Sequence, residues 1–482
     1  KEAFKQAGAT QFGSADQRRE LREVLRLPSH AEVHSAERWT IELMPESPSR
    51  NRRDGTVRRP GYAASADSPV GRRGAKTRAL IKSTAATLFT TNGFHGTSID
   101  DIARSLGGSR ATVYQYFANK DQIYAEMVGD CQQAVLDHVH GLGPLGPDDA
   151  GLEALRRWLR GWSDIYDSYA AVFLEFPAIG ALDSVRVGDP ARILTVVKEV
   201  HEVIADRLAR AGVVGMDPLV ASAVLTRIAH MVNLYRYRGM FDMPDRDATA
   251  AAVAATLQRI FFPEGGSDVD VPPRSGEPTP APPATVLTAT DARRSPVRED
   301  VLTVSSALFA ERGYHGVGME EIAAAAGISR ATLYRHFNSK ARILAELTDV
   351  AIDRTRELAL ELTAIADNGL DTGRLHDWIL RFVVLHRRFH GVTRAWFDGA
   401  VIEELGETNI LRSINALRDA ADAVVAQLDL PDDTDPIIAT GVVLAVLGRM
   451  TEPLEWAPDD PEYAAELILR ILWRCLLRFQ RT

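Results

Sequence analysis

The chain has 482 residues, of which 45% are hydrophobic and 25% are charged, and its formal net charge is -9. This length suits two or three domains, and the composition is that of an ordinary globular protein rather than a disordered or fibrous one. No apolar run reaches the length of a membrane span, and no basic-then-apolar leader opens the sequence. We therefore expect a cytoplasmic protein that has no membrane partner.

Residues 1–74 form an N-terminal extension that we expect to be a largely disordered, basic arm. Between positions 50 and 82, ten Lys and Arg residues stand against only Asp54 and Asp67. Such a basic run next to a binding domain favours contact with nucleic acid, although the whole chain is acidic. We expect Arg72 and Arg73 to touch DNA phosphates or the minor groove; the alternative is a solvated tail.

Residues 97–120 read as two short helices joined by a tight turn. Ser98 stands where an N-cap is expected, and Asp101 follows at the spacing of a capping box. Gly107 and Gly108 then break the helical pattern, because glycine accepts backbone angles that other residues avoid. The first of the two helices is thus predicted over residues 98–106.

Ser109 is expected to cap the second helix, over residues 110–117, with Val113 and Phe117 facing inward. The polar side chains left on its outer face are Arg110, Thr112, Gln115 and Tyr116. A short helix with such a face, docked across a glycine turn on a partner helix, is typical of a helix-turn-helix reader of DNA.

The same stretch recurs 220 positions later, at residues 317–340. Aligned without gaps, residues 88–124 and 308–344 share about 16 identities, which is a clear internal repeat. The repeat predicts a second reading head in the same chain.

These residues resemble the N-terminal domain of the TetR family of bacterial transcription regulators, over about 50 residues in each copy. The features that match are Leu88-Phe89, Gly93-Phe94, Ile102-Ala103, residues 109–117 and Lys120, and their counterparts Leu308-Phe309, Gly313-Tyr314, Ile322-Ala323, residues 329–337 and Lys340. With two copies, the chain is similar to the tandem-TetR repressors of mycobacteria and their relatives. It departs from the family at Gly318, where a hydroxyl residue normally caps the helix.

The resemblance implies an all-α fold of two tandem TetR-like modules. Each module would combine a three-helix DNA-binding head with a helical-bundle ligand and dimerisation domain. The expected boundaries are heads at 75–120 and 296–340, bundles at 121–262 and 341–482, and a Pro-rich linker at 263–295. Broad apolar faces on the last two helices of each module predict that the modules pair with each other, or that each pairs with another chain.

The resemblance also assigns roles to individual residues. Arginines at the start of the second helix can donate two hydrogen bonds to guanine, while hydroxyls and lysines hold phosphates. The expected DNA contacts are Ser98, Ser109, Arg110, Thr112, Tyr114, Gln115, Tyr116 and Lys120 in the first head, and Ser329, Arg330, Thr332, Tyr334, Arg335, His336 and Lys340 in the second. A solvated or salt-bridged arginine is the alternative for Arg110 and Arg330.

Aromatic residues recur at helical spacing in both bundles, where they either line a ligand pocket or only fill the core. The candidates for a pocket are Trp158, Trp162, Tyr166, Phe173, Trp378, Phe382 and Trp396. A small apolar or amphipathic effector is the expected ligand.

An enzyme is the rival class. His386 and His390 lie four apart, but no Glu, Cys or carboxylate completes a metal site, and no catalytic motif is present. We expect no enzyme activity, no cofactor and no metal, and we expect Cys131 and Cys475 to be buried free thiols. The sequence thus predicts an operator-binding repressor, paired within the chain or as a homodimer. The alternative is a sequence-tolerant architectural DNA-binding protein without an effector.

Overall fold

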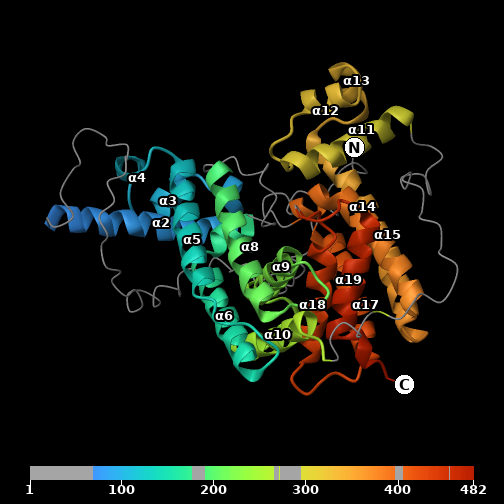
Figure 1. Ribbon diagram of the computed structural model, residues 1–482. Helices are drawn as coiled ribbons and strands as arrows, with labels where there is room; N and C mark the ends of the chain where they lie inside the picture. Colours follow the sequence, from blue (N-terminus) through green and yellow to red (C-terminus); the bar gives the residue numbers. More distant parts are fainter. Residues whose placement is uncertain are drawn as a thin grey trace.

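The computed structural model describes residues 69–175, 190–264, 271, 295–396, 405, 407–454 and 456–481. The elements in these ranges are helices arranged as two modules (Figure 1), so the predicted all-α class is confirmed. The extension up to residue 68 and most of the Pro-rich linker, including their expected disorder, lie outside the described residues. Among the helices in the described ranges, none combines the length and the hydropathy that a transmembrane helix requires.

The first module opens with a helix that is longer than predicted. It begins at Pro69 rather than at residue 75, because proline is well accommodated in a first turn, where backbone N–H groups have no helical partner. Near its end Gly93 has a φ of 74°, a conformation that glycine adopts at little cost. The helices of this module are α2 (Pro69–Gly96), α3 (Ile99–Ser105), α4 (Arg110–Tyr116), α5 (Lys120–His140), α6 (Asp149–Ser168), α7 (Ala170–Glu175), α8 (Pro190–Ala211), α9 (Pro218–Tyr237), η3 (Met240–Asp242) and α10 (Arg246–Phe261).

The second module repeats this plan with different lengths. Its helices are α11 (Pro296–Arg312), α12 (Met319–Ala325), α13 (Arg330–His336), α14 (Lys340–Asp367), α15 (Thr372–Ala395), α17 (Glu407–Ala426), α18 (Pro436–Arg449), α19 (Pro461–Cys475) and η5 (Leu477–Phe479). The helix that leaves the head, α14, has 28 residues, whereas its counterpart α5 has 21. The two ligand domains are therefore related but not identical.

The last long helices of both modules, α9 and α10 with α18 and α19, pack together in the middle of the molecule (Figure 1). Every residue of α9 from position 220 to 233 is buried, as is every residue of α18 from 438 to 447. A helix that is buried all round must lie inside a bundle. The modules thus pair with each other, which is the intramolecular one of the two predicted arrangements.

Arginines from both modules cross this interface in a reciprocal way. Arg474, at the end of α19, donates to the carbonyl oxygens of Val214 at 2.7 Å and Ile260 at 3.1 Å. Arg259, near the end of α10, donates to Asp433 at 2.8 Å and to Thr434 at 2.6 Å. Each arginine reaches the loop that precedes the penultimate long helix of the other module, so the interface has an approximate two-fold symmetry.

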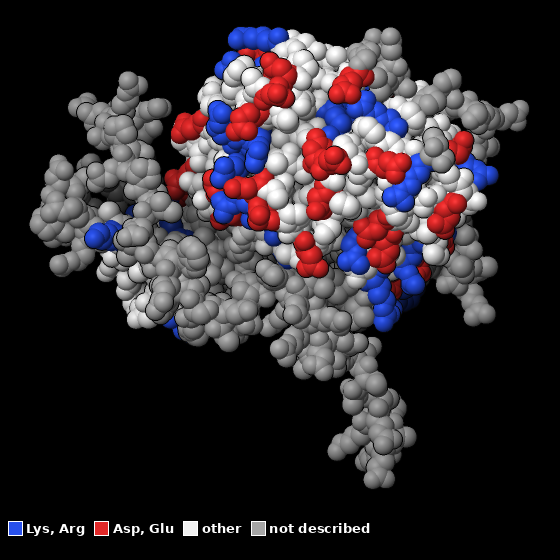
Figure 2. Space-filling view, turned by 90° about the horizontal axis from the view of Figure 1, so that it is seen from below, with Lys and Arg blue, Asp and Glu red and all other residues white. Residues whose placement is uncertain are grey.

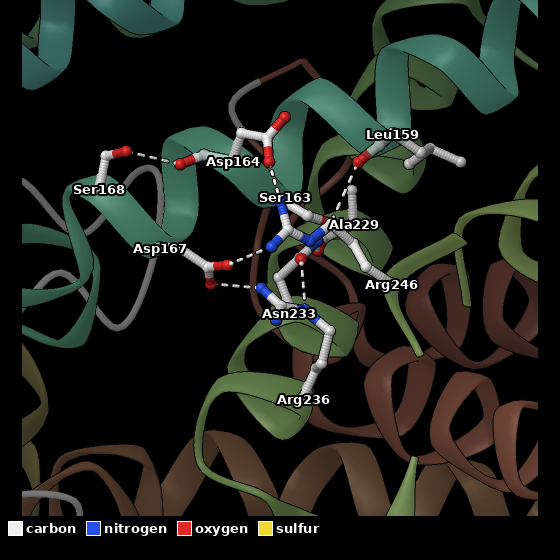
Figure 3. Close-up of polar contacts among 9 residues, drawn as sticks. All are labelled: Leu159, Ser163, Asp164, Asp167, Ser168, Ala229, Asn233, Arg236 and Arg246. Carbon is white, nitrogen blue, oxygen red and sulfur yellow. Dashed lines mark hydrogen bonds and ion pairs between the residues drawn. The ribbon is translucent and has the colours of Figure 1, made fainter. Parts of the chain in front are cut away.

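Charged side chains also join helices within the first module. Arg246 of α10 pairs with Asp164 and Asp167 of α6, and Arg236 of α9 pairs with the same Asp167 (Figure 3). This network fastens α6 to the helices of the central bundle. On the face opposite α11–α13, the described residues mix Lys and Arg with Asp and Glu (Figure 2), so this face offers no uniformly basic surface to DNA.

Candidate nucleic-acid interface

The first recognition helix, α4, is built by local capping. The Ser109 Oγ accepts a hydrogen bond from the backbone N–H of Thr112 at 3.2 Å, as an N-cap does. Val113 and Phe117 are buried, as predicted, and Phe117 follows the helix as its C-cap rather than as its last residue. The preceding turn has Gly107 at a φ of 65°, so α4 docks on α3 across a turn that favours glycine.

The capping box of α3 is complete. Ser98 Oγ accepts from the N–H of Asp101 at 3.2 Å, and the Asp101 carboxylate accepts from the N–H of Ser98 at 2.9 Å. The hydrogen bonds from Ser98 hold the pKa of Asp101 below its usual value. In the second head Gly318 keeps only the return bond, from its N–H to Glu321 at 2.8 Å, so the departure seen in the sequence removes one cap and one exposed hydroxyl.

The second recognition helix, α13, repeats the first. Ser329 Oγ accepts from the N–H of Thr332 at 3.1 Å, and Leu333 and Phe337 are buried. Burial follows the same order in the two heads: Ala111 to Lys120 and Ala331 to Lys340 show the same alternation of exposed and buried positions. The same positions of the recognition helix are therefore exposed in both heads.

The side chains on these surfaces fall into two groups. Tyr114 and Tyr334 are 38% and 42% exposed, which is high for tyrosine and suits contact with a DNA backbone. Gln115 and Arg335 are also exposed. The predicted contacts that are only partly exposed are Thr112, Tyr116, Thr332 and His336.

Arg110 and Arg330 are both salt-bridged in the DNA-free molecule. Arg110 pairs with Asp100 of α3 and Arg330 pairs with Glu320 of α12, while the two side chains remain 65% and 62% exposed. Hydrogen bonding to Tyr334 and the charge of Glu320 raise the pKa of Arg330 further. The alternative foreseen for the arginines thus describes the free protein. Because both pairs are exposed, they are weak enough for DNA to compete.

Lys120 and Lys340, which we expected to hold phosphates, are occupied inside the heads. The Lys120 ammonium donates to the carbonyl oxygens of Phe94 at 2.6 Å and Thr97 at 2.9 Å and lies 4.3 Å from the centre of the Phe94 ring. Lys340 makes the same contacts with Tyr314 and Val317. In the DNA-free molecule these lysines fix the turn before α3 and α12, because charge-assisted bonds to backbone carbonyls are strong. Their contact with phosphates stays a prediction.

Sequence reasoning missed a second repeated contact beneath the recognition helices. Arg78 pairs with Glu126 and lies 4.3 Å above the Phe117 ring. Arg298 pairs with Glu346 in the same way, lies 4.2 Å above the Phe337 ring and donates to the His336 carbonyl at 2.8 Å. The signal was present: both residues of the pair recur at the repeat spacing, although Glu126 and Arg78 lie outside the aligned stretch.

Two further predicted contacts are only partly placed. The backbones of Arg72 and Arg73 belong to α2, near its start, but their side chains lie outside the described residues. Their role in DNA binding stays a prediction.

The two heads meet at equivalent residues. His95 lies in the last turn of α2, beyond Gly93, His315 follows α11, and their rings stack with centroids 4.1 Å apart. The recognition helices α4 and α13 lie at the outer ends of the heads, well apart from one another (Figure 1). Two capped helix-turn-helix units in a fixed mutual arrangement define the class of this protein, a two-headed DNA-binding protein.

Comparison with known proteins identifies both heads. The family described as "Bacterial regulatory proteins, tetR family" matches at residues 81–127 and again at residues 301–347. The transcriptional activator FasR of Mycolicibacterium smegmatis is 41% identical over 56 residues, which cover 12% of this chain and 26% of FasR. The biofilm operon regulator IcaR of Staphylococcus epidermidis is 38% identical over 53 residues, or 11% of this chain and 29% of IcaR. The chain thus spans less than a third of the length of these relatives.

Two solved structures each match less than half of this chain. A TetR/AcrR-family regulator from Thermobifida fusca is 22% identical, covers 38% of this chain and 97% of its own, and has a TM-score of 0.29. AibR, solved with isovaleryl coenzyme A and operator DNA, is 21% identical, covers 39% and 98%, and has a TM-score of 0.31. The present chain thus carries two domains in tandem that match the TetR family, one in each head.

The candidate ligand residues separate into two groups. Phe173, Phe382 and Trp396 line a pocket between the modules. Trp158, Trp162 and Tyr166 instead stack on one another or on Phe173 inside the first module, and all three are buried. Trp378 is fully buried and donates to the Leu358 carbonyl at 2.8 Å, so it is a core residue and not a pocket residue.

Proposed function

We propose that this chain is a transcriptional repressor whose two heads bind one DNA operator with sequence specificity. The observation that carries the proposal is the pair of equivalent recognition helices, α4 and α13, each opening with an exposed arginine and joined in one paired molecule. Arginine is the side chain that most commonly reads guanine in the major groove. Such a protein acts in the cytoplasm and needs no cofactor for DNA binding.

The operator has two related but unequal half-sites. Arg110 and Arg330 are shared between the heads, whereas Gln115 is replaced by Arg335 and Tyr116 by His336. Glutamine favours adenine and arginine favours guanine at base edges, so the half-sites differ where these side chains reach the DNA.

A small apolar or amphipathic effector releases the DNA. The helices α5 and α14 connect each head to its ligand domain, and their first residues, Lys120 and Lys340, are hydrogen-bonded to the turn of the head. A tilt of either helix therefore moves its head. Two heads must match major grooves roughly 34–36 Å apart, so a modest tilt suffices. Ligand and operator then weaken each other's binding by the same factor.

Footprinting of the DNA around the gene for this chain tests the proposal. Wild-type protein is compared with Arg110→Ala and Arg330→Ala, and Arg104→Ala serves as a control because Arg104 is exposed in the first head but lies outside α4. We expect each recognition variant to lose protection at its own half-site and the control to retain both.

Other outcomes distinguish the alternatives. If only Arg110→Ala loses protection of DNA, the second module is a sensing or pairing unit. Each operator would then need two chains. Uniform protection that ignores sequence would replace the repressor by an architectural DNA-binding protein, because phosphate contacts alone carry no sequence information.

A further inference from the structure

A pocket lies where the two modules meet, and both modules supply its walls. Met231, Leu234 and Phe241 come from the first module, and Phe382, Phe389 and Leu417 come from the second. The cavity volume is about 190 Å³, whereas one water needs only about 10–15 Å³. The space therefore suits an apolar ligand rather than a few waters.

One end of this pocket is charged and buried. Arg449 of α18 donates to Glu452 at 2.7 Å, and their side chains are 7% and 11% exposed. His390 lies 3.5 Å from the same carboxylate. Behind them, Arg227 of α9 donates to the carbonyl oxygens of Arg449 at 2.7 Å and Pro453 at 3.0 Å. The first module thus places a second cation beside the pocket.

The charges at this end do not balance. Burial lowers the pKa of His230 to about 3 and that of His386 to about 4, so both are neutral at pH 7. Burial raises the pKa of Glu452, but Arg449, His390 and Arg227 outweigh burial and leave the carboxylate ionised. Within the described residues, the Arg449 guanidinium pairs with the Glu452 carboxylate, whereas the Arg227 guanidinium donates only to backbone carbonyl oxygens. The positive charge of Arg227 therefore has no carboxylate of its own. An excess buried charge is costly unless it is paired.

Unused hydrogen-bond donors lie on the same walls. Within the part of the chain that the structure describes, the Arg449 Nε and the Ser413 Oγ are buried and have no hydrogen-bond partner, and both residues line the pocket. Buried polar atoms without partners are uncommon in native proteins. An anionic ligand supplies what both atoms lack.

We propose that the pocket binds one apolar monocarboxylate per chain, with its hydrocarbon part between the modules and its carboxylate at Arg449. A neutral ligand would leave the excess positive charge uncompensated, and a cationic ligand would increase it. Binding of this ligand does not depend on the proposed function, whereas its role as the effector that releases DNA rests on that function. Because residues of both modules form the walls, ligand binding depends on the relative position of the two modules.

Gly448 provides a way to close the pocket without removing charge. It lies in α18 and lines the pocket, and a Cβ built on it meets nothing within 4 Å. Gly448→Leu therefore fills the space and favours the helix. Gly129→Leu is the matched control, because Gly129 is also a helical glycine with open space around it and is not a lining residue.

The test is calorimetric titration of the full chain, without DNA, with sodium decanoate, 1-decanol and decyltrimethylammonium. We expect decanoate to bind at one site per chain and about tenfold or more tightly than decanol, the difference that a charge-assisted hydrogen bond makes. Gly448→Leu abolishes this binding and Gly129→Leu preserves it. Arg449→Met removes the preference for decanoate, whereas Glu452→Gln, which keeps the side-chain shape, tightens decanoate binding.

Equal affinity for the three probes, no saturable decanoate binding, or unchanged binding in Gly448→Leu would each overturn the proposal. The opposite changes expected for Arg449→Met and Glu452→Gln guard against a variant that merely unfolds. Operator affinity with and without decanoate is measured separately. If decanoate binds in the pocket but operator affinity is unchanged, the site is supported. In that case the ligand of this pocket is not the effector of the proposed function.

Discussion

His95 and His315 occupy equivalent positions in the two heads, 220 residues apart in the sequence, and their rings stack at a centroid distance of 4.1 Å. The stack joins the end of α2 to the turn between α11 and α12. It therefore restrains the distance between the two reading surfaces at a point on the approximate symmetry axis.

Removing this stack is expected to loosen the spacing of the heads. His95→Ala and His315→Ala should each make the protein tolerate operators whose half-sites are one base pair closer or farther apart, and the double variant should add little to either single change, because the interaction needs both rings. Gel-shift affinities on a series of spaced operators measure this. Additive effects of the single changes would show that the rings act independently.

Releasing the recognition arginines from their acidic partners is expected to strengthen DNA binding. Asp100→Asn leaves Arg110 without its carboxylate partner, and Glu320→Gln does the same for Arg330. Exposed ion pairs contribute up to about 1 kcal/mol, so affinity should rise by up to about fivefold. Direct titration of operator DNA measures the change. Asp101→Asn is the contrasting variant, since it removes the capping-box carboxylate and should lower head stability instead.

Lys120→Met is expected to destabilise the first head even in the absence of DNA. The substitution removes two hydrogen bonds to backbone carbonyls, and the loss should be about 2 kcal/mol in the free energy of unfolding. Lys82→Met is the control, because it breaks only a surface ion pair with Asp130 and should cost less than about 1 kcal/mol. Denaturant unfolding of the free protein compares them. Normal stability with weakened DNA binding would contradict this structural role and support the phosphate contact predicted for Lys120.

Acid is expected to destabilise the protein through its buried histidines. Burial lowers the pKa of His386 to about 4, whereas an unfolded histidine titrates near 6.5. The unfolded chain then binds more protons, so stability is full above about pH 6.5 and falls as the pH drops toward 4. At pH 5 the loss from this residue should be about 2 kcal/mol. Urea unfolding at pH 7 and pH 5 should show a smaller loss for His386→Gln; parallel losses would exclude His386 as a cause.

The heads could be predicted closely from sequence because their structure is local. Ser98, Asp101 and Ser109 cap helices through residues three positions away, and such signals need no knowledge of the rest of the fold. The structural role of Lys120 could not be predicted, because its partners, Phe94 and Thr97, lie more than twenty positions earlier. Only the three-dimensional turn brings those carbonyls to the ammonium group.

The pocket between the modules shows the limit of what helical periodicity in a sequence can predict. Trp378 and Phe382 are four residues apart on one face of α15, yet the first is sealed in the core and the second lines the pocket. Helical spacing reports that a side chain is buried, but not whether empty space lies beside it. The Arg449–Glu452 pair drew no attention in the sequence, because its importance depends on burial between two modules that are far apart along the chain.

The reciprocal contacts of Arg259 and Arg474, which pair the two modules, affect how the two reading surfaces can evolve. In a regulator made of two identical copies, any change in the reading surface appears twice, so the operator must change symmetrically. Here the partner module is part of the same polypeptide chain, so the two modules pair whatever the cellular concentration of the protein. Each module can therefore change its own DNA preference while it remains paired with the other. Two different modules always pair in this chain, whereas two separate chains could also form two kinds of homodimer.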